Sequence, residues 1–427
     1  MTMSTALLTD HYELTMLQAA LRSGAAQRRA VFEVFARHLP GGRRYGVVAG
    51  IGRVLDELER FRFGDEELAY LSEKKIVDAE TLAFLADYRF SGSVYGYREG
   101  DLYFPASPIL VVEGTFAEAV LLETMALSIL NHDCAIASAA SRMSNAAGSR
   151  PLIEMGSRRT HERAAVAAAR AAYIAGFTAT SNLMAGHVYG VPTAGTAAHA
   201  FILLHDSEKA AFEAQIASMG VGTTLLVDTY DVPEAVRTAV ELAGGDLGAV
   251  RIDSGDLAAA AQEVREQLDA LGAFKTRILV TSDLDEYAIA ALAAAPVDAY
   301  GIGTSLVTGS GVPTAALVYK LVARETATGK LEPVAKRSVG KPSRGGRKNA
   351  YRLLDPTGHF DTELVTTSAM VPEGGIPLLH ELVREGTVIG REPLESARTR
   401  HREAVNRLPQ EALHLGRGYA AIPTEFA

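Results

Sequence analysis

The sequence predicts an α/β protein with an irregular TIM-like (β/α) barrel over residues 149–325. An N-terminal α+β domain precedes it over 1–148, and a C-terminal extension, 326–427, is expected to pack back on both. Two observations predict the barrel. From about residue 150, short β-branched runs alternate with alanine-rich helical runs, a pattern typical of a parallel sheet with right-handed crossovers. The region also has room for seven or eight strands, which favours a closed barrel over a doubly wound sheet.

The N-terminal domain mixes helical and strand-like periodicity. Its predicted helices span 8–23, 50–61 and 117–147, and its predicted strands span 31–35, 93–97 and 109–113. Thr9 or Asp10 is expected to cap the first helix, because short polar side chains accept from the first free N–H groups.

In the barrel region, strand and helix candidates follow one another in order. The strand candidates are 152–155, 177–180, 191–195, 223–227, 249–252, 277–281 and 298–302. The helices between them include 164–175, 207–219, 233–243, 257–271 and 285–294. Beyond the barrel, glycine, lysine and arginine cluster over 329–348, and a further strand is predicted at 351–354.

Composition excludes several classes of protein. A hydrophobic content of 48% indicates a folded globular protein. The net charge of −9 argues against nucleic acid or membrane binding through a general positive field. Cys134 is the single cysteine, so no internal disulfide is possible. Without a secretory signal pattern or an uncharged 18-residue apolar run, the expected location is the cytoplasm.

Polar residues follow every strand candidate of the barrel. The motif at 251–256, Arg-Ile-Asp-Ser-Gly-Asp, places one guanidinium and two carboxylates after a strand, and Asp256 is a plausible cap of the next helix. In barrels these strand ends form the ligand-binding face. A single polar strand end is usually a cap or a turn, but seven in succession favour a polar ligand site.

The residue types at these ends indicate the ligand chemistry. Asp228, Asp253 and Asp283 suit ribose hydroxyls or Mg²⁺, or else cap helices. Arginines at 158, 159 and 251 suit a carboxylate or phosphate, or else form ion pairs with Glu154, Asp253 or Asp256. The glycine-rich turn at 301–305 comes where barrels commonly bind phosphate, although a tight turn alone would also explain it.

Other catalytic arrangements are missing from the barrel region. Between the first and last strand candidates, 152–302, the lysines are Lys209 and Lys275, and neither follows a strand, which argues against a Schiff-base aldolase. Its histidines have no zinc-ligand spacing, and the sequence has no Gly-X-Ser-X-Gly elbow. The residues therefore favour group transfer between a phosphorylated sugar and a small molecule.

Six motifs in order along the chain resemble the nicotinate phosphoribosyltransferase family. They are Thr-Asp-His-Tyr-Glu-Leu-Thr-Met at 9–16, Glu-Met-Gly-Ser-Arg-Arg at 154–159, Gly-Thr-Ala-Ala-His at 195–199, Val-Asp-Thr-Tyr-Asp at 227–231, Arg-Ile-Asp-Ser-Gly-Asp at 251–256 and Gly-Ile-Gly-Thr at 301–304. The basic stretch at 333–338 also matches. The resemblance ends near residue 352.

The resemblance implies formation of nicotinate mononucleotide and diphosphate from nicotinate and 5-phosphoribosyl 1-diphosphate, coupled to ATP hydrolysis, in NAD salvage. It also implies Mg²⁺, a TIM-like barrel and a homodimer. The implied nicotinate-binding residues are Tyr12, Thr196, Arg251 and Arg159. Those implied for the phosphoribosyl diphosphate are Thr304, Gly303, Asp228, Asp283 and Arg158. His199 would be the phosphorylated histidine, and Asp253 a catalytic carboxylate and Mg²⁺ ligand.

One departure and three alternatives stand beside this resemblance. Many relatives carry Phe where this chain has Met155, although a thioether can also contact an aromatic face. The sister nicotinamide phosphoribosyltransferases use an aspartate to receive the amide, whereas residues 180–182 here are Thr-Ser-Asn. A barrel lyase or isomerase acting on a sugar phosphate would show no diphosphate chemistry. A non-catalytic ligand-binding relative fits poorly with the full set of polar strand ends.

Overall fold

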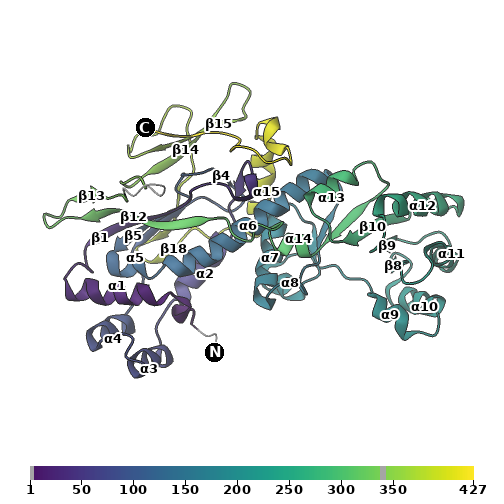
Figure 1. Cartoon of the computed structure of the whole chain (residues 1–427), viewed down its shortest axis with the longest axis horizontal. Helices are drawn as coiled ribbons and strands as arrows, with labels where there is room; N and C mark the ends of the chain where they lie inside the picture. The colour runs from purple at the N-terminus through teal and green to yellow at the C-terminus, as the bar shows by residue number, and fades with distance from the viewer. Residues whose placement is uncertain (1–3, 337–342) are drawn as a thin grey trace. The chain divides into compact units, whose positions relative to one another are not determined.

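The computed structural model describes residues 4–336 and 343–427 and divides into two compact units (Figure 1). Unit 1 comprises Met1–Ser138 and Val312–Ala427, and unit 2 comprises Ala139–Gly311. The first boundary falls inside α6 (Glu123–Ala147). In the predicted basic stretch 333–338, Arg337 and Ser338 lie outside the described residues.

Unit 2 is built on a six-stranded parallel sheet of order β7-β6-β11-β10-β9-β8. The strands are β6 (Leu152–Glu154), β7 (Ala179–Thr180), β8 (Thr224–Leu226), β9 (Ala249–Ile252), β10 (Arg277–Ser282) and β11 (Ala299–Ile302). The helices that follow them are α7 (Glu162–Ile174), α8 (Leu183–Tyr189), α9 (His199–Leu204), α10 (Glu208–Met219), α11 (Val232–Ala243), α12 (Leu257–Ala270), α13 (Glu286–Ala291) and α14 (Thr304–Val307). The predicted alternation of parallel strands with helices is confirmed.

The prediction of a third strand at residues 191–195 is wrong, because the structure has no regular strand there. Only an isolated parallel bridge joins Thr193 to Thr180. The Thr180 N–H donates to the Pro192 carbonyl at 2.9 Å, and the Ala194 N–H donates back to the Thr180 carbonyl at 2.9 Å. Proline has no N–H for a ladder, so the pairing ends after one bridge. In the described residues no pairing joins this segment to β8.

Unit 1 contains the helices and strands of the N-terminal α+β region together with the C-terminal part of the chain. Its helices are α1 (His11–Arg22), α2 (Ile51–Arg60), α3 (Asp65–Glu73), α4 (Ala79–Ala86), α5 (Phe116–Val120) and α15 (Leu394–Asn406), with the first part of α6. Asp10 is the N-cap residue of α1, although its side chain makes no capping hydrogen bond. The predicted long or broken helix at 117–147 is broken into α5 and α6.

A seven-stranded antiparallel sheet, of order β13-β12-β1-β5-β3-β17-β18, forms the centre of unit 1. Its strands are β1 (Arg29–Ala36), β3 (Ser93–Gly96), β5 (Leu110–Thr115), β12 (Leu317–Glu325), β13 (Leu331–Pro333), β17 (His380–Arg384) and β18 (Thr387–Val388). The sequence assigns β12 to the end of the barrel region. In the structure it pairs along its length with β1.

Two smaller sheets complete unit 1. One has the order β16-β14-β15-β19, and the other pairs β2 with β4. Their strands are β14 (Asn349–Leu354), β15 (Phe360–Thr366), β16 (Ile376–Pro377), β19 (Thr424–Phe426), β2 (Gly46–Val47) and β4 (Leu102–Tyr103). The predicted strand at 351–354 is part of β14.

Strand β1 is buried on both faces, which explains its nearly continuous apolar sequence. Phe32 stacks on Tyr319 of β12 with ring centroids 4.9 Å apart. Glu33 is also buried, and its carboxylate accepts from the Lys348 ammonium group at 2.8 and 2.9 Å. The ion pair satisfies a charge that would otherwise be costly to bury.

Among the described residues, one segment has the length and hydropathy of a membrane span. It is Phe116–Ala147, which includes α5 and α6, and 67% of its most apolar window is buried inside the protein. A buried apolar helix of this kind is typical of a protein core.

Candidate functional site

The candidate site lies where the parallel strands of unit 2 end. Parallel strands bring their carboxyl ends to one edge of the sheet. Glu154 ends β6, Arg251 lies near the end of β9, and Thr281 lies near the end of β10. Hydrogen bonds connect neighbouring strand ends, so residues from separate motifs form one polar surface.

Arg251 is held by three hydrogen bonds from different nitrogens of its guanidinium. Nε donates to Thr281 Oγ1 at 2.8 Å, Nη2 donates to Asp253 Oδ1 at 3.2 Å, and Nη1 donates to the Ala197 carbonyl at 3.4 Å. The side chain is only 15% exposed. A guanidinium has five N–H groups, so one remains on each terminal nitrogen. Those two groups can donate to a carboxylate or a phosphate.

His199 begins α9 and faces two carboxylates. Its Nε2 lies 3.9 Å from Asp228 Oδ1 and 3.7 Å from Asp253 Oδ2, and its Nδ1 lies 3.1 Å from Thr229 Oγ1. The Asp228 side chain is 4% exposed, and its Oδ2 accepts from the Asp253 N–H and the Ser254 hydroxyl. Among the described residues, Asp228 Oδ1 is buried and has no hydrogen-bond partner.

The electrostatic environment differs between the two sides of this cluster. Partial burial alone would raise the pKa of Asp253, but the hydrogen bond from Thr281 and the charges of Arg251 and His199 hold it below the ordinary value. Desolvation and the carboxylates of Asp231, Asp228 and Glu234 instead raise the pKa of Glu208, at the start of α10, to about 7. Perturbed carboxyl groups of this kind are frequent at functional sites.

Different aspartates cap the neighbouring helices. The capping residues of α11, α12 and α13 are Asp231, Asp256 and Asp285, each accepting from N–H groups of the first turn. The expected cap at Asp256 is confirmed. Because the caps are supplied by these residues, the carboxylates of Asp228 and Asp253 remain available to the site. Asp283 is exposed, and in the described part of the chain no hydrogen bond joins it to this cluster.

Glu154 organises the turn that carries the two predicted arginines. It is fully buried, and its carboxylate accepts from the Gly156 N–H and the Thr180 hydroxyl. Burial is the main influence on its pKa, which is raised. Arg158 and Arg159 are exposed, and no ion pair joins either of them to Glu154 in the described residues. Ion pairing with Glu154, one alternative for these arginines, is therefore not realised.

The glycine-rich turn after β11 is constrained by packing. A Cβ on Gly301 would lie 2.7 Å from Met155 Sδ and 2.5 Å from the Thr281 methyl, so no larger side chain fits without movement. Gly303 has more room, since its nearest contact would be the Met155 carbonyl at 3.3 Å. Met155 therefore packs at the strand ends against Gly301. Thr304 begins α14 directly after this turn.

The remaining predicted site residues do not join the hydrogen-bonded cluster. Thr196 is exposed in the segment before α9. Tyr12 belongs to α1 of unit 1 and is 44% exposed, and burial followed by the nearby Glu123 carboxylate raises its phenol pKa.

Three residues of the cluster were not singled out by the sequence: Thr229, Thr281 and Glu208. Threonine at a strand end gives no sequence signal that separates a structural hydroxyl from one that orients a catalytic group. Thr281 could have been found from pairing, because β10 aligns Leu279 with Arg251. Two residues further along, Thr281 falls opposite Asp253, on the same face of the sheet.

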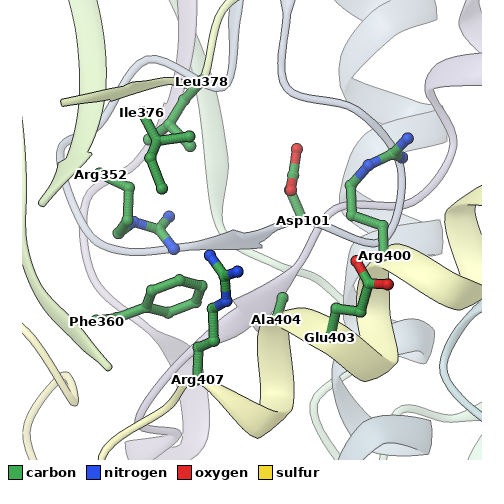
Figure 2. A pocket seen from close by; sticks show the side chains of 9 residues that line it. All are labelled: Asp101, Arg352, Phe360, Ile376, Leu378, Arg400, Glu403, Ala404 and Arg407. Atoms are coloured by element: carbon green, nitrogen blue, oxygen red, sulfur yellow. The ribbon is translucent and has the colours of Figure 1, made fainter. Parts of the chain in front are cut away.

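A cavity of about 150 Å³ lies elsewhere, inside unit 1, between β14, β15 and α15 (Figure 2). Figure 2 shows Arg352 and Arg407 pointing into it beside the Phe360 ring. Arg352 already pairs with Glu363 at 2.6 Å, and Arg400 pairs with Glu392 at 2.6 Å. No predicted site residue lines this cavity, so the strand ends of unit 2 remain the candidate site.

Comparisons with known proteins agree over nearly the whole chain. A family model described as the nicotinate phosphoribosyltransferase (NAPRTase) N-terminal domain matches residues 7–131, and the NAPRTase family model matches residues 151–368. A nicotinate phosphoribosyltransferase of Mycobacterium tuberculosis is 57% identical over 429 residues, covering 98% of this chain and 94% of that protein. One from Bacillus subtilis is 38% identical over 370 residues, covering 83% of this chain and 74% of that protein.

A solved structure is similar over nearly the whole chain as well. The human nicotinic acid phosphoribosyltransferase superposes with a TM-score of 0.84 at 27% sequence identity. The superposition covers 98% of this chain and 97% of that one.

Proposed function

The chain belongs to the nicotinate phosphoribosyltransferase family, and from this premise we propose that it joins nicotinate to 5-phosphoribosyl 1-diphosphate in NAD salvage. The products are nicotinate mononucleotide and diphosphate. The pyridine nitrogen attacks C1 of the ribose through its lone pair, the bond from C1 to the diphosphate oxygen breaks, and that oxygen leaves with the electron pair. No proton has to be removed from nicotinate, so positioning and charge stabilisation are the main tasks of the protein.

The observation that carries this proposal is the geometry of Arg251. Its three internal hydrogen bonds leave one N–H on each terminal nitrogen. These two groups would bind the planar carboxylate of nicotinate with two charge-assisted hydrogen bonds. Thr196, Arg159 and Tyr12 are proposed as the other nicotinate contacts, with Met155 near the ring.

We assign the diphosphate to the same edge of the unit 2 sheet, formed by the carboxyl ends of its strands. Arg158, the backbone at Gly303, Thr304, Asp228 and Asp283 are its proposed contacts, with the aspartates serving ribose hydroxyls or metal-bound water. The side chain of Arg158 is exposed, so it can neutralise charge on the leaving diphosphate.

Mg²⁺ is the proposed cofactor, and the carboxylates fit it in part. The buried Asp228 Oδ1 lacks a donor, and Asp253 Oδ2 faces the same space beside His199. Oxygen atoms of this kind suit Mg²⁺. The described residues hold no group of three side chains that could bind a metal alone, so phosphate and water oxygens would complete its coordination. When bound, the ion would neutralise phosphate charge.

ATP coupling is proposed to act through His199. The imidazole is 41% exposed at the site edge and would accept the γ-phosphoryl group of ATP. Hydrolysis of the phosphohistidine would then reset the site. We further propose a cytoplasmic homodimer in which Tyr12 of one subunit reaches the nicotinate site of the other, and an irregular barrel whose gap lies between the 191–195 segment and β8.

Nicotinamide is the second candidate substrate, and Asn182 argues against it. The Asn182 side chain accepts from the Ala185 N–H at 3.0 Å and donates to Ser157 Oγ at 3.0 Å, so the strand end carries no carboxylate for an amide. The test measures diphosphate release with nicotinate or nicotinamide, each with and without ATP. Release with nicotinate that ATP stimulates supports the proposal, whereas equal or faster release with nicotinamide contradicts it.

A further inference from the structure

Two consecutive residues, Asp228 and Thr229, contact opposite nitrogens of the His199 ring. Thr229 Oγ1 lies 3.1 Å from Nδ1, and Asp228 Oδ1 lies 3.9 Å from Nε2. Asp253 Oδ2 adds a second carboxylate oxygen 3.7 Å from Nε2. The loop between β8 and α11 thus contacts both ring nitrogens, and the loop after β9 adds a second carboxylate at Nε2.

The chemistry of these partners selects one neutral tautomer. Carboxylate oxygens only accept hydrogen bonds, whereas a threonine hydroxyl donates or accepts. A lone pair on Nε2 would face two negative oxygens, 3.7 and 3.9 Å away, and be repelled by both. A proton on Nε2 replaces this repulsion with attraction, and the lone pair on Nδ1 then accepts from the Thr229 hydroxyl.

We propose that Thr229 is a positioning residue that holds the His199 ring so that the Nδ1 lone pair has a fixed direction, while Asp228 and Asp253 keep the ring proton on Nε2. The inference deepens the ATP coupling proposed above and depends on it for its catalytic meaning. Thr229 itself touches neither ATP nor the transferred group in the resting site. The carboxylates decide which nitrogen is the nucleophile, and Thr229 fixes where that nitrogen points.

The arrangement also balances charge during phosphoryl transfer. The bond between the γ-phosphorus and the β,γ-bridging oxygen breaks, a bond from phosphorus to Nδ1 forms, and ADP leaves with the bridging electron pair. The ring keeps its Nε2 proton and becomes cationic, a change that Asp228 and Asp253 favour, as in other carboxylate–histidine pairs. The Thr229 hydroxyl can then rotate to donate to a phosphoryl oxygen.

The first experiment reads the tautomer directly in the enzyme without ATP. Long-range ¹H–¹⁵N correlation spectra of protein labelled at the histidine ring, with the His199 signals identified by their loss in His199→Ala, distinguish the two nitrogens. The expected result is a protonated Nε2 and an unprotonated Nδ1 in the wild type, and the same tautomer in Thr229→Val, because both carboxylates remain. A proton on Nδ1 in the wild type overturns the proposal.

The second experiment measures initial rates of phosphate labelling from γ-labelled ATP. Thr229→Val, which keeps the shape and removes the hydroxyl, is expected to lower the rate about tenfold, the effect of losing one hydrogen bond of ~1.4 kcal/mol. Thr229→Ser should restore most of it. Thr178→Val is the matched control, because the Thr178 hydroxyl donates to the Leu152 carbonyl instead.

The two experiments separate failure of this inference from failure of the ATP coupling. If the wild type takes up no acid-labile phosphate, the coupling fails, and the spectra still decide the tautomer. If the wild type is labelled but Thr229→Val is labelled at the same rate, the coupling stands and the positioning role is wrong.

Discussion

Arg251→Lys is expected to raise the KM for nicotinate at least tenfold. Arginine keeps its fork in place because Nε is bound to Thr281 and Nη2 to Asp253. Lysine offers one nitrogen with three N–H groups, which cannot reach Thr281, Asp253 and both carboxylate oxygens at once. Losing one charge-assisted hydrogen bond costs about 1.5–3 kcal/mol, which is roughly a tenfold to hundredfold change at 1.4 kcal/mol per factor of ten.

The assay is steady-state kinetics with varied nicotinate at saturating 5-phosphoribosyl 1-diphosphate. Arg265→Lys is the matched control, because Arg265 is similarly buried at 19% exposure and bonds to Asp269 and two backbone carbonyls in the same unit. The control should leave the KM for nicotinate unchanged. An unchanged KM in Arg251→Lys would refute the assignment of Arg251 to the nicotinate carboxylate.

Three further predictions test other parts of the account. His199→Ala should lose ATP hydrolysis and ATP stimulation but keep a slow ATP-independent transfer. In the wild type, peptide mapping should find the acid-labile phosphate label on His199 alone. Mixing inactive Tyr12→Ala and Arg251→Ala chains should restore part of the activity if the site is shared; no recovery after proven subunit exchange would exclude this. The pKa of Glu208 is raised from 4.5 to about 7 in the folded protein, so its contribution to stability is lost as the pH rises through that interval. Glu208→Gln should therefore raise Tm relative to wild type at pH 8, while Glu213→Gln on the same helix should not.

The sequence predicted the strand ends well because they depend on local signals. Residues 249–252 form β9 as predicted, and Asp256 caps the helix that follows. Strand and cap both follow from short-range periodicity and side-chain chemistry. The prediction of a strand at 191–195 was wrong, because Pro192 limits the pairing with Thr180 to one bridge. This limit depends on which strand lies beside the segment, and the local sequence does not give that neighbour.

Long-range pairing explains most of what the sequence did not predict. The pairing of β12 with β1 joins residues almost 300 positions apart, and neither segment carries a local sequence signal that predicts this pairing. The same limit hid Thr281 and Thr229, whose roles depend on Arg251 and His199 being nearby in space. The acidic and basic site residues could be predicted from the sequence, whereas the hydroxyl groups that orient them could not.

Substrate selection is the central claim, and a competition experiment tests it most directly. Equal concentrations of nicotinate and nicotinamide are supplied together with 5-phosphoribosyl 1-diphosphate, ATP and Mg²⁺, and the two mononucleotides are separated and counted at low conversion. The product ratio equals the ratio of kcat/KM values, so it is independent of enzyme concentration. The account predicts nicotinate mononucleotide in large excess, formed in step with diphosphate. A comparable or greater yield of nicotinamide mononucleotide, or product without diphosphate, would contradict it.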